Sequence, residues 1–383
     1  MKETSLAHKI MHICLSDGWG GLEMYPARII PELQRQGWEC HGLALVGSRV
    51  AESLTIAGVE PLLAPSRGRA LLQVRRVLAY LDRHAIDVLH CHKSSDLRLG
   101  ALLATLRPSL KLFFTDHMGV TRPKKDPYHR WAYGKVTRLF SISEATRQRN
   151  LEAFPLPAAR IRRLYLGIDL APYVPQLDAV AREALRRDVG VGPDQIAIGL
   201  PGRLTDGKGH EVWLEALAHL RDLAPDMAWH GVMIGGLTAR EGSNEEYVSQ
   251  LRSQIRELGL EEQVTFTGFR GDLPRLFEAL DIVCVPSRNE AFGLTVVEAM
   301  AAGKAVLGAD SGAIPELLEA GCGRLAAANE PTVWAERMAE LGRETELRCS
   351  LGQAARARAE MAFGISAHIE ALANEYLGRQ IRR

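Results

Sequence analysis

The chain has 383 residues, of which 46% are hydrophobic and 24% are charged, and its formal net charge is +1. This length is too great for one ordinary hydrophobic core and fits two globular domains. The near-zero net charge removes any general electrostatic case for nucleic acid as a partner.

Short apolar runs alternate with amphipathic helical stretches, which is the pattern of a parallel sheet covered by helices. In the first half the predicted strands are 9–15, 39–46, 59–63, 87–90, 111–115 and 138–142, and the predicted helices include 71–83 and 95–106. The pattern restarts near Gln195, with predicted strands at 196–200, 228–234, 264–267, 282–285 and 305–308.

We therefore predict an α/β protein with two doubly wound, Rossmann-like domains at 1–170 and 194–365. Residues 171–193 contain three prolines and two glycines and are expected to form the linker. The last segment, 366–383, has a helical pattern over 366–378, and we expect it to pack back on the first domain. Open parallel sheets bind ligands at the carboxyl ends of their strands. Two such domains facing one another therefore predict a cleft lined by strand-to-helix loops.

The six cysteines show no metal-ligand spacing, and several of them lie in apolar runs. We expect them to be reduced, buried thiols of a cytoplasmic protein. The apolar stretch 10–15 is too short for a signal peptide, and no run reaches the length of a membrane-spanning helix. Any membrane contact is therefore expected to be peripheral, at the inner face of the cytoplasmic membrane.

Positive charge is concentrated in two loops. They contain Arg122, Lys124 and Lys125, and Arg160, Arg162 and Arg163. Such runs are usually solvated faces. The alternative is a surface that meets anionic lipid or a phosphorylated acceptor.

The loop 17–23 follows the first predicted strand and contains Gly18, Gly20 and Gly21. Glycines between a strand and a helix let the backbone approach a ligand, and a helix N-terminus favours an anion. The third glycine of the dinucleotide-binding fingerprint is absent. The loop therefore predicts either a ligand contact or an ordinary tight turn.

The corresponding loop of the second half, 202–209, carries Arg203 and Lys208 between glycines. Arginine offers a planar fork to phosphate oxygens, and lysine offers a compact charge. No Ser or Thr follows the lysine directly, so this is not a P-loop. We favour diphosphate binding over a merely exposed basic turn.

The segment 286–303 is an apolar strand end, a polar loop and an alanine-rich helix. Glu290 falls in the loop, where it can face sugar hydroxyls. Glu298 falls about one turn inside the helix, on an apolar face, where a carboxylate needs a hydrogen-bonding partner such as a ribose diol. The free N–H groups at the start of this helix can hold a phosphate.

These segments, in this order, resemble the motifs of the large family 4 of retaining glycosyltransferases over nearly the whole chain. The matching segments are Gly20-Gly21-Leu22-Glu23, Ser141-Ile142-Ser143-Glu144, Gly202-Arg203-Leu204 with Lys208-Gly209, Val264-Thr265-Phe266-Thr267-Gly268-Phe269, and the pair Glu290 and Glu298. The resemblance implies the GT-B fold and transfer of a sugar from a nucleotide diphosphate-sugar. One departure is Leu166, which stands where many relatives have Asn before the Gly-Ile-Asp stretch.

The resemblance also implies roles for individual residues. Catalysis would depend on His117, Glu290, Arg203 and Lys208, with the two cations neutralising the diphosphate. The implied donor-binding residues are Gly20, Gly21, Gly202, Phe269, Arg270, Phe292, Gly293, Leu294, Thr295 and Glu298. Taken alone, a single histidine such as His117 is more often structural, and its position after a strand narrows that difference.

The acceptor is expected to be a growing bacterial envelope glycan or glycolipid, such as lipopolysaccharide core, bound by the first domain. The residues expected to contact it are Glu23, Lys93, Arg122, Lys124 and Lys125, with His12 also near the rim. For the donor we favour a UDP-hexose, with GDP-mannose second.

No Asp-x-Asp pair occurs in the chain, so the expected reaction uses neither a metal ion nor another cofactor. The expected course is same-face attack, in which the departing phosphate helps to accept the proton of the acceptor. Two alternatives stay open: a non-catalytic nucleotide-sugar-binding subunit and a GT-B nucleotide-sugar epimerase.

Overall fold

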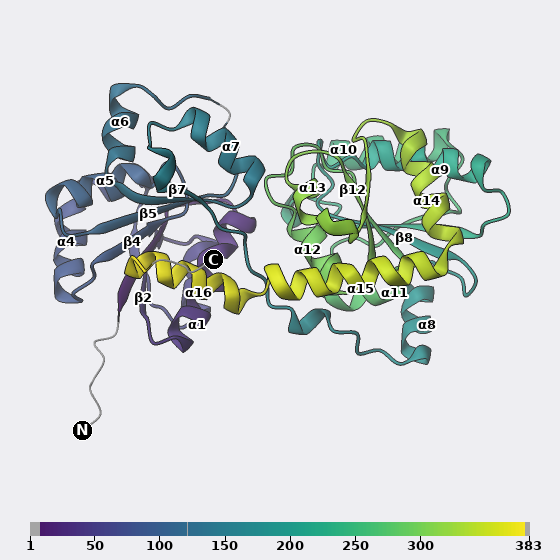
Figure 1. Cartoon of the computed structure of the whole chain (residues 1–383), viewed down its shortest axis with the longest axis horizontal. Coiled ribbons are helices and arrows are strands. Elements are labelled where there is room, and N and C mark those ends of the chain that lie inside the picture. Colours follow the sequence, from purple (N-terminus) through teal and green to yellow (C-terminus); the bar gives the residue numbers. More distant parts are fainter. Residues whose placement is uncertain (1–7, 121, 380–383) are drawn as a thin grey trace. The chain divides into compact units, whose positions relative to one another are not determined.

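The computed structural model describes residues 8–120 and 122–379. The chain divides into two compact units, Met1–Gly167 with Ile365–Arg383, and Ile168–Gly364. We call them the first and the second unit (Figure 1). Among the described residues, no helix combines the length and the apolar character needed to cross a bilayer.

The first unit contains a seven-stranded parallel sheet in the order β3-β2-β1-β4-β5-β6-β7. Its strands are β1 (Lys9–Cys14), β2 (Glu39–Leu45), β3 (Leu62–Ala64), β4 (Val88–Cys91), β5 (Lys111–Asp116), β6 (Val136–Ser141) and β7 (Ile161–Arg163). Its helices are α1 (Gly21–Arg35), α2 (Arg49–Ile56), α3 (Arg67–Leu72), α4 (Val74–Arg83), α5 (Leu97–Leu106), α6 (Pro127–Gly134), α7 (Glu144–Ala153) and α16 (Ile365–Leu377). The chain order reverses between β1 and β4, which makes this the switch point where doubly wound sheets bind ligands.

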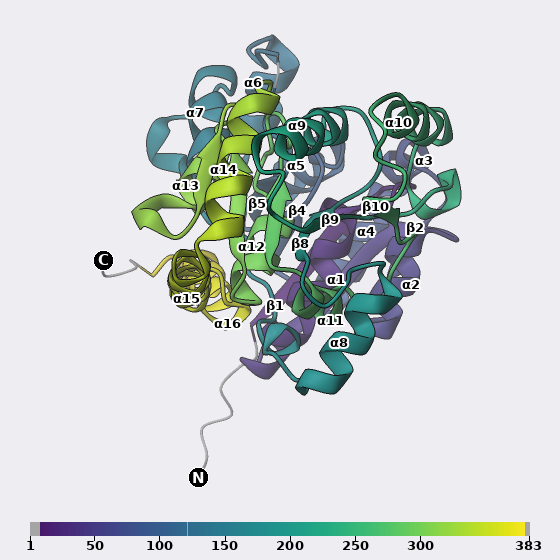
Figure 2. The same ribbon diagram turned by 90° about the vertical axis from the view of Figure 1, so that its right-hand side faces the viewer.

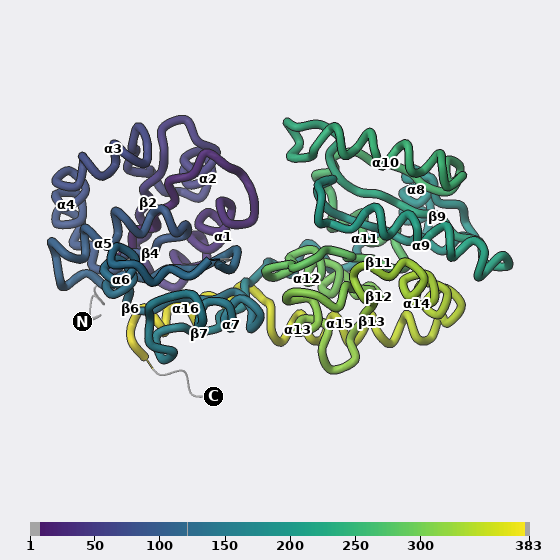
Figure 3. The backbone as a smooth tube through the Cα atoms, turned by 90° about the horizontal axis from the view of Figure 1, so that it is seen from above, coloured from purple at the N-terminus to yellow at the C-terminus, as the bar shows by residue number. Residues whose placement is uncertain are grey.

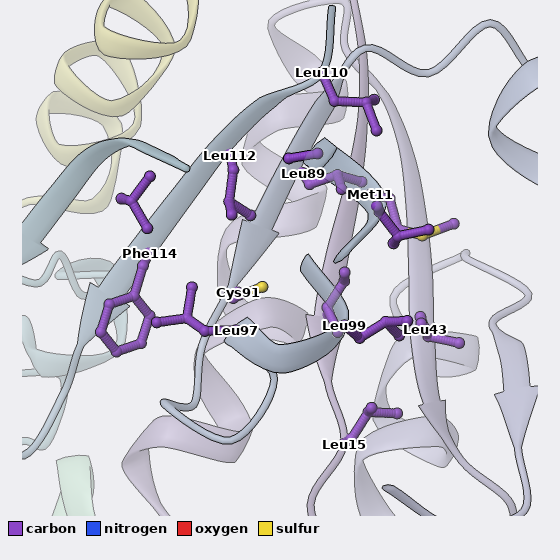
Figure 4. Packing of buried hydrophobic residues seen from close by; sticks show 14 of the residues in the cluster. Met11, Leu15, Leu43, Leu89, Cys91, Leu97, Leu99, Leu110, Leu112 and Phe114 are labelled. Carbon is purple, nitrogen blue, oxygen red and sulfur yellow. The ribbon is translucent and has the colours of Figure 1, made fainter. Parts of the chain in front are cut away.

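The two faces of this sheet are buried in different ways. Alternate residues of a strand point to opposite faces, and Met11, Leu89 and Leu112 belong to an aliphatic cluster with residues of α5 (Figure 4). On the other face, His90 lies between Tyr376 of α16 and Thr115 of β5, with its Nδ1 2.5 Å from the Tyr376 hydroxyl and its Nε2 2.8 Å from the Thr115 hydroxyl. The packing of α16 against the sheet therefore includes a polar contact between Tyr376 and His90.

The second unit contains a six-stranded parallel sheet in the order β10-β9-β8-β11-β12-β13. Its strands are β8 (Ile196–Pro201), β9 (Trp229–Ile234), β10 (Val264–Phe266), β11 (Ile282–Val285), β12 (Ala305–Ala309) and β13 (Arg324–Ala326). Its helices are α8 (Ala179–Asp188), α9 (His210–Leu223), α10 (Glu245–Glu257), α11 (Leu273–Ala279), α12 (Leu294–Ala301), α13 (Ile314–Leu317), α14 (Pro331–Arg343) and α15 (Thr345–Ala362). Helices α9 and α14 lie side by side (Figure 2). The switch point here is between β8 and β11, and the predicted α/β class with two doubly wound sheets is confirmed.

The segment 171–193, expected as a linker, belongs to the second unit and contains α8. Asp178 caps this helix by accepting a hydrogen bond from the Ala181 N–H at 2.8 Å. Arg186 forms an ion pair with Asp281 at 3.0 Å and donates to the carbonyl of Ala279 at 2.9 Å. These contacts attach α8 to the second sheet and to the end of α11.

Candidate active site

Three polar side chains are in contact at the switch point of the first sheet. Ser16, which follows β1, donates to Glu23 Oε1 at 2.7 Å and accepts from Lys93 Nζ at 2.9 Å. Lys93 follows β4, and its Nζ lies 3.7 Å from Glu23 Oε1. The structure thus brings together Glu23 and Lys93, two of the predicted acceptor residues. Ser16 was missed, because a single serine after a strand carries no distinctive sequence signal.

A second buried group holds the end of β1. Asp96 Oδ2 accepts the Leu15 N–H at 3.4 Å, and burial raises the pKa of this carboxyl to about 7. Arg67 donates from Nε to the carbonyl of Leu15 at 2.7 Å. Side chains therefore bind both the N–H and the carbonyl of Leu15, which fixes the direction in which the following loop leaves the sheet.

Gly18, in the loop between β1 and α1, lets the backbone lie close to Glu23 of α1. A Cβ atom at Gly18 would lie 3.1 Å from Glu23 Oε1. Gly20 is the N-cap of α1 and supplies no side-chain hydrogen bond to it. The first N–H groups of the helix, starting at Gly21, therefore have no side-chain cap, and such groups are available to an anion.

His117 directly follows β5 and is buried. Its ring packs edge-on against Tyr25 of α1, with the ring centroids 4.8 Å apart. Neither ring nitrogen has a hydrogen-bond partner among the described residues. Burial lowers the pKa of His117 to about 3, so the ring is neutral near pH 7 and can both donate and accept one hydrogen bond.

The basic loop before α6 contributes to a small cavity. Lys124 lines a cavity of about 190 Å³ together with Arg98 of α5 and Tyr128 of α6. The Arg98 guanidinium lies 5.8 Å from the centre of the Tyr128 ring, a cation–π contact. Arg122 and Lys125 are exposed outside this cavity. The loop therefore offers one half-buried and two exposed cations.

Three buried histidines lie close together on strands β1 and β4 and just after β4. They are His12, His90 and His92, whose ring nitrogens lie within 4.8 Å of one another. His12 Nδ1 lies 3.1 Å from His92 Nε2, whereas both nitrogens of His90 have oxygen partners, as described above. His12 is 0% exposed, so it lies in the interior of the unit and not at the rim where we expected it.

In the second unit the loops after β8 and β11 meet at the switch point. Lys208 Nζ lies 2.7 Å from Glu290 Oε2, and both side chains are half-buried. The Arg288 N–H donates to the carbonyl of Gly207 at 2.9 Å, which joins the two loops through their backbones. The structure thus pairs a predicted phosphate ligand with a predicted sugar ligand.

Glycines make this close approach possible. Gly209 has φ of +77°, and a Cβ atom there would lie 2.4 Å from the carbonyl oxygen of Pro286. Gly312 has φ of +62°, and its Cβ would lie 2.4 Å from the carbonyl oxygen of Glu290. That carbonyl accepts the Ala313 N–H at 2.9 Å. The loop carrying Glu290 is therefore held on both sides by backbone contacts that only glycine permits.

Helix α12 begins directly after this loop. Its N-cap is Gly293, with φ of +102° and no side-chain cap, and Leu294 and Thr295 are its first two residues. Phe292 is buried beneath them, with its ring centroid 6.0 Å from that of Phe363. Glu298 lies one turn further along and is half-buried. The start of α12 therefore combines an uncapped helix N-terminus with a carboxylate, as the sequence predicted.

The remaining predicted donor residues differ in how they are held. Arg203 is exposed, and the preceding Gly202 donates its N–H to the carbonyl of Ile234 at 2.9 Å. Phe269 is 64% exposed. Arg270 instead binds two acids: its Nε lies 2.8 Å from Asp272 Oδ1, and its NH1 lies 3.0 Å from an oxygen of Asp188.

His210, the first residue of α9, was not predicted. It is buried two residues after Lys208 in the chain, and neither ring nitrogen has a partner among the described residues. Burial lowers its pKa to about 3, and the Lys208 charge acts in the same direction. Like His117, it is a neutral ring with free hydrogen-bonding atoms, and only its position after a glycine-rich loop distinguished it in the sequence.

Two family models match the chain. Residues 19–172 match the model described as Glycosyltransferase Family 4, and residues 181–358 match the model described as Glycosyl transferases group 1. Together the two matched ranges span most of the chain, and the second contains both loops that carry Lys208 and Glu290.

Curated relatives share part of the sequence with this chain. The D-inositol 3-phosphate glycosyltransferase of Corynebacterium jeikeium is 34% identical over 229 residues, 59% of this chain and 54% of that protein. The lipopolysaccharide core biosynthesis mannosyltransferase LpcC of Rhizobium leguminosarum bv. viciae is 29% identical over 238 residues, 61% of each chain. The match thus spans little more than half the length of these relatives.

Solved structures of similar proteins match almost the whole chain. Alr3699/HepE of Anabaena, solved in complex with UDP, is 25% identical, with a TM-score of 0.81 over 97% of this chain and 100% of that one. The two chains therefore share their fold across both units.

Proposed function

We propose that this chain, a member of glycosyltransferase family 4, transfers a hexose from a nucleotide diphosphate-sugar to a bacterial envelope glycan. The favoured donor is a UDP-hexose, which the UDP complex of the Anabaena protein supports. GDP-mannose is the second candidate donor. Lipopolysaccharide core is the favoured acceptor, supported by the name of the Rhizobium relative.

The pairing of Lys208 with Glu290 carries this proposal. An ammonium group has three donors, and one of them is used by Glu290 at 2.7 Å. The other two are available for oxygens of the donor's diphosphate. Glu290 keeps Oε1 for hydroxyl groups of the donor sugar. The pair thus places a ligand for the leaving group beside a ligand for the transferred group, which is the arrangement that glycosyl transfer requires.

Neutralisation of the leaving diphosphate is the main catalytic contribution that we assign to the second unit. Lys208 and Arg203 supply positive charge, and the N–H groups at Gly293, Leu294 and Thr295 supply donors at a helix N-terminus. Such preorganised donors act most strongly where negative charge develops in the transition state. These cations provide the charge that a metal ion provides in other transferases, and we propose a metal-independent reaction.

The nucleoside part of the donor is assigned to side chains around these loops. Glu298 would bind the ribose hydroxyls, and Phe269 offers an exposed ring to the base. Gly202 would lie beside the phosphates. Arg270 is held by Asp188 and Asp272, so we assign it to positioning Phe269 rather than to direct charge neutralisation.

In the first unit, His117 is the residue assigned to the donor sugar. A neutral imidazole with two unpartnered nitrogens can exchange hydrogen bonds with sugar hydroxyls without adding charge to the site. Gly20 and Gly21 are assigned to the donor through the uncapped start of α1.

The acceptor is assigned to the first unit. Glu23 and Lys93, joined through Ser16, would bind its hydroxyl groups. Lys124 would bind it at the rim of the neighbouring cavity. Arg122 and Lys125 are exposed cations that suit a phosphorylated acceptor.

Peripheral membrane contact is a further part of the proposal. Tyr128 and Trp131 of α6 are exposed close in sequence to Arg122, Lys124 and Lys125. Aromatic rings and cations on one surface are typical of a segment at the membrane interface.

Retention of configuration is proposed to proceed by attack on the face from which the leaving group departs. In this course the phosphate oxygen accepts the proton of the acceptor hydroxyl. Lys208 and Arg203 would hold that phosphate beside the acceptor while its charge increases. A double displacement through a carboxylate is the alternative for retaining enzymes.

The donor site is tested by thermal stabilisation with UDP, GDP, ADP and dTDP, with and without magnesium. We expect one nucleotide to raise the melting temperature in both conditions, and the shift to disappear in Lys208→Gln. Arg343→Gln, which removes an exposed 2.7 Å ion pair with Asp226 in the same unit, is the matched control and should keep the shift. If no nucleotide at millimolar concentration stabilises the wild type, the donor assignment is wrong.

A further inference from the structure

A larger cavity lies at the β7 edge of the first unit's sheet. Its volume is about 840 Å³, and its walls come from β6, β7, α7 and the end of α16. These elements lie side by side in the first unit (Figure 3). The volume lies within the range of sites for small organic ligands. No residue of this cavity has a role in the function proposed above.

The lining of the cavity is strongly basic. It contains five arginines and two glutamates, a difference of three positive charges, whereas the formal net charge of the entire chain is +1. These residues are Arg138, Arg147, Arg162, Arg163, Arg379, Glu144 and Glu375. Positive charge in a concave surface concentrates the field and attracts anions.

Two of the arginines are paired within the cavity wall. Arg138 Nε donates to Glu375 Oε2 at 2.9 Å, which joins β6 to the end of α16. Arg147 donates to Glu144 Oε1 at 2.8 Å within α7. Both glutamates are therefore already bound by a cation.

The other three arginines have no carboxylate partner within 4.0 Å in the described part of the chain. They are Arg162 and Arg163 on β7 and Arg379 just after α16. The Arg163 guanidinium lies 4.5 Å from the centre of the Tyr165 ring. A cation–π contact of this kind uses the face of the guanidinium and leaves its N–H donors available.

The chemistry of these groups selects the ligand. The guanidinium fork matches the oxygens of a phosphoryl group and binds it in two places at once. Several such forks around one concave site suit a phosphoryl group better than a single carboxylate. Phe140 and Ile161 are buried behind the wall, and the half-buried Leu164 offers apolar contact to the uncharged part of the ligand.

We propose that this cavity, the arginine cavity, binds a phosphoryl group through Arg162, Arg163 and Arg379. The phosphoryl group belongs either to a free phosphorylated molecule or to an anionic lipid headgroup, which present the same oxygens. This site is separate from the donor site of the second unit, and the proposal holds whether or not the proposed transfer reaction is correct.

The test compares two double variants of the full chain. Arg162→Gln/Arg163→Gln removes two exposed cations of the arginine cavity from the edge strand. Arg69→Gln/Arg75→Gln removes two exposed cations from α3 and α4 of the same unit and is the matched control. Inorganic pyrophosphate is titrated by calorimetry, with all proteins carrying Lys208→Gln to weaken the donor site. Sedimentation with phosphatidylglycerol vesicles, and with neutral phosphatidylcholine vesicles, is the second arm.

We expect the cavity variant to lose about tenfold or more in affinity for at least one anionic probe, because two charged hydrogen-bonding forks are removed. The control variant should stay within about twofold of its parent, since α3 and α4 do not line the cavity and salt screens their exposed charges. Loss with pyrophosphate assigns a free phosphorylated ligand, and loss with vesicles alone assigns a lipid headgroup. Equal affinities of both variants for both probes, or no binding to either probe, would overturn the proposal. If the cavity variant melts early, Arg379→Gln alone replaces it.

Discussion

Acid should destabilise the first unit through its buried histidines, and His12 allows one of them to be tested alone. Its ring is buried on β1, and burial lowers its pKa to about 3. In an unfolded chain the imidazole pKa is about 6.5. Between these two values the unfolded chain binds a proton that the folded chain does not bind. Protonation of His12 in the unfolded chain therefore lowers the free energy of unfolding as the pH falls below about 6.5.

The size of this effect follows from proton linkage. Between pH 7.5 and pH 5.5, one such histidine lowers the free energy of unfolding by about 1.4 kcal/mol. Other buried groups act in both directions. His117 and His368, with pKa values of about 3 and 4, add to the loss. Asp96, with its pKa raised to about 7, takes up a proton in the folded state and opposes the loss. A comparison of the wild type with His12→Gln cancels these other contributions.

The assay is urea unfolding followed by circular dichroism at both pH values. The wild type should lose about 1.4 kcal/mol more stability than His12→Gln between pH 7.5 and pH 5.5. His219→Gln, which removes an exposed histidine of α9, should lose as much as the wild type. Hydrogen exchange of peptides from β1 and β4 assigns the transition to the first unit. Equal losses in the wild type and in His12→Gln, within about 0.4 kcal/mol, would refute the reasoning.

Four further substitutions separate structural from binding roles. Gly209→Ala should destabilise the second unit by about 1–3 kcal/mol and weaken nucleotide binding, because the new Cβ would strain a positive-φ backbone and clash with Pro286. An unchanged melting temperature and nucleotide affinity would contradict this prediction. Phe269→Ala should lower nucleotide affinity by about tenfold at an unchanged melting temperature, since an exposed ring that stacks on a base is lost. Arg270→Ala should instead lower the melting temperature, because it leaves two acids unpaired. The reverse pattern of effects would exchange the roles of the two residues. Glu23→Gln should lower turnover in rate measurements and leave nucleotide affinity unchanged in titrations. Weaker nucleotide binding by this variant would contradict the assignment of Glu23 to the acceptor site.

The fold was predictable where strands are long and apolar. All the strands of four or more residues were predicted, with ends that differ by at most two residues. Of the three-residue strands, β3 and β10 were predicted and β7 and β13 were missed, because three residues show a period only weakly. Helix α8 lies in the stretch expected as a linker, where prolines and glycines obscured its pattern. Its contact through Arg186 with Asp281 depends on residues far apart in the sequence, which no local pattern reveals.

The candidate site was predictable where loops combine glycine with charge. The segments with Lys208 and Glu290 were identified separately, and the sheet order then places them in contact, since β8 and β11 are neighbours at the switch point. Ser16 was missed because its role comes from packing against Glu23 and Lys93. His12 was misplaced for a related reason. The sequence does not show that β1 lies next to β4, and this neighbour buries His12 against His92.

Nucleotide release from UDP- and GDP-hexoses, measured with and without EDTA, tests the central claim most directly. The wild type should release one nucleotide, by hydrolysis or by transfer to an added glycan, and the rate should persist in EDTA. Lys208→Gln should lower that rate about 100-fold or more, the usual effect of removing one stabilising group from a transition state. Arg343→Gln should leave it unchanged. A wild type that binds a nucleotide tightly but releases none from any of these donors would contradict the transferase assignment and favour a non-catalytic binding role.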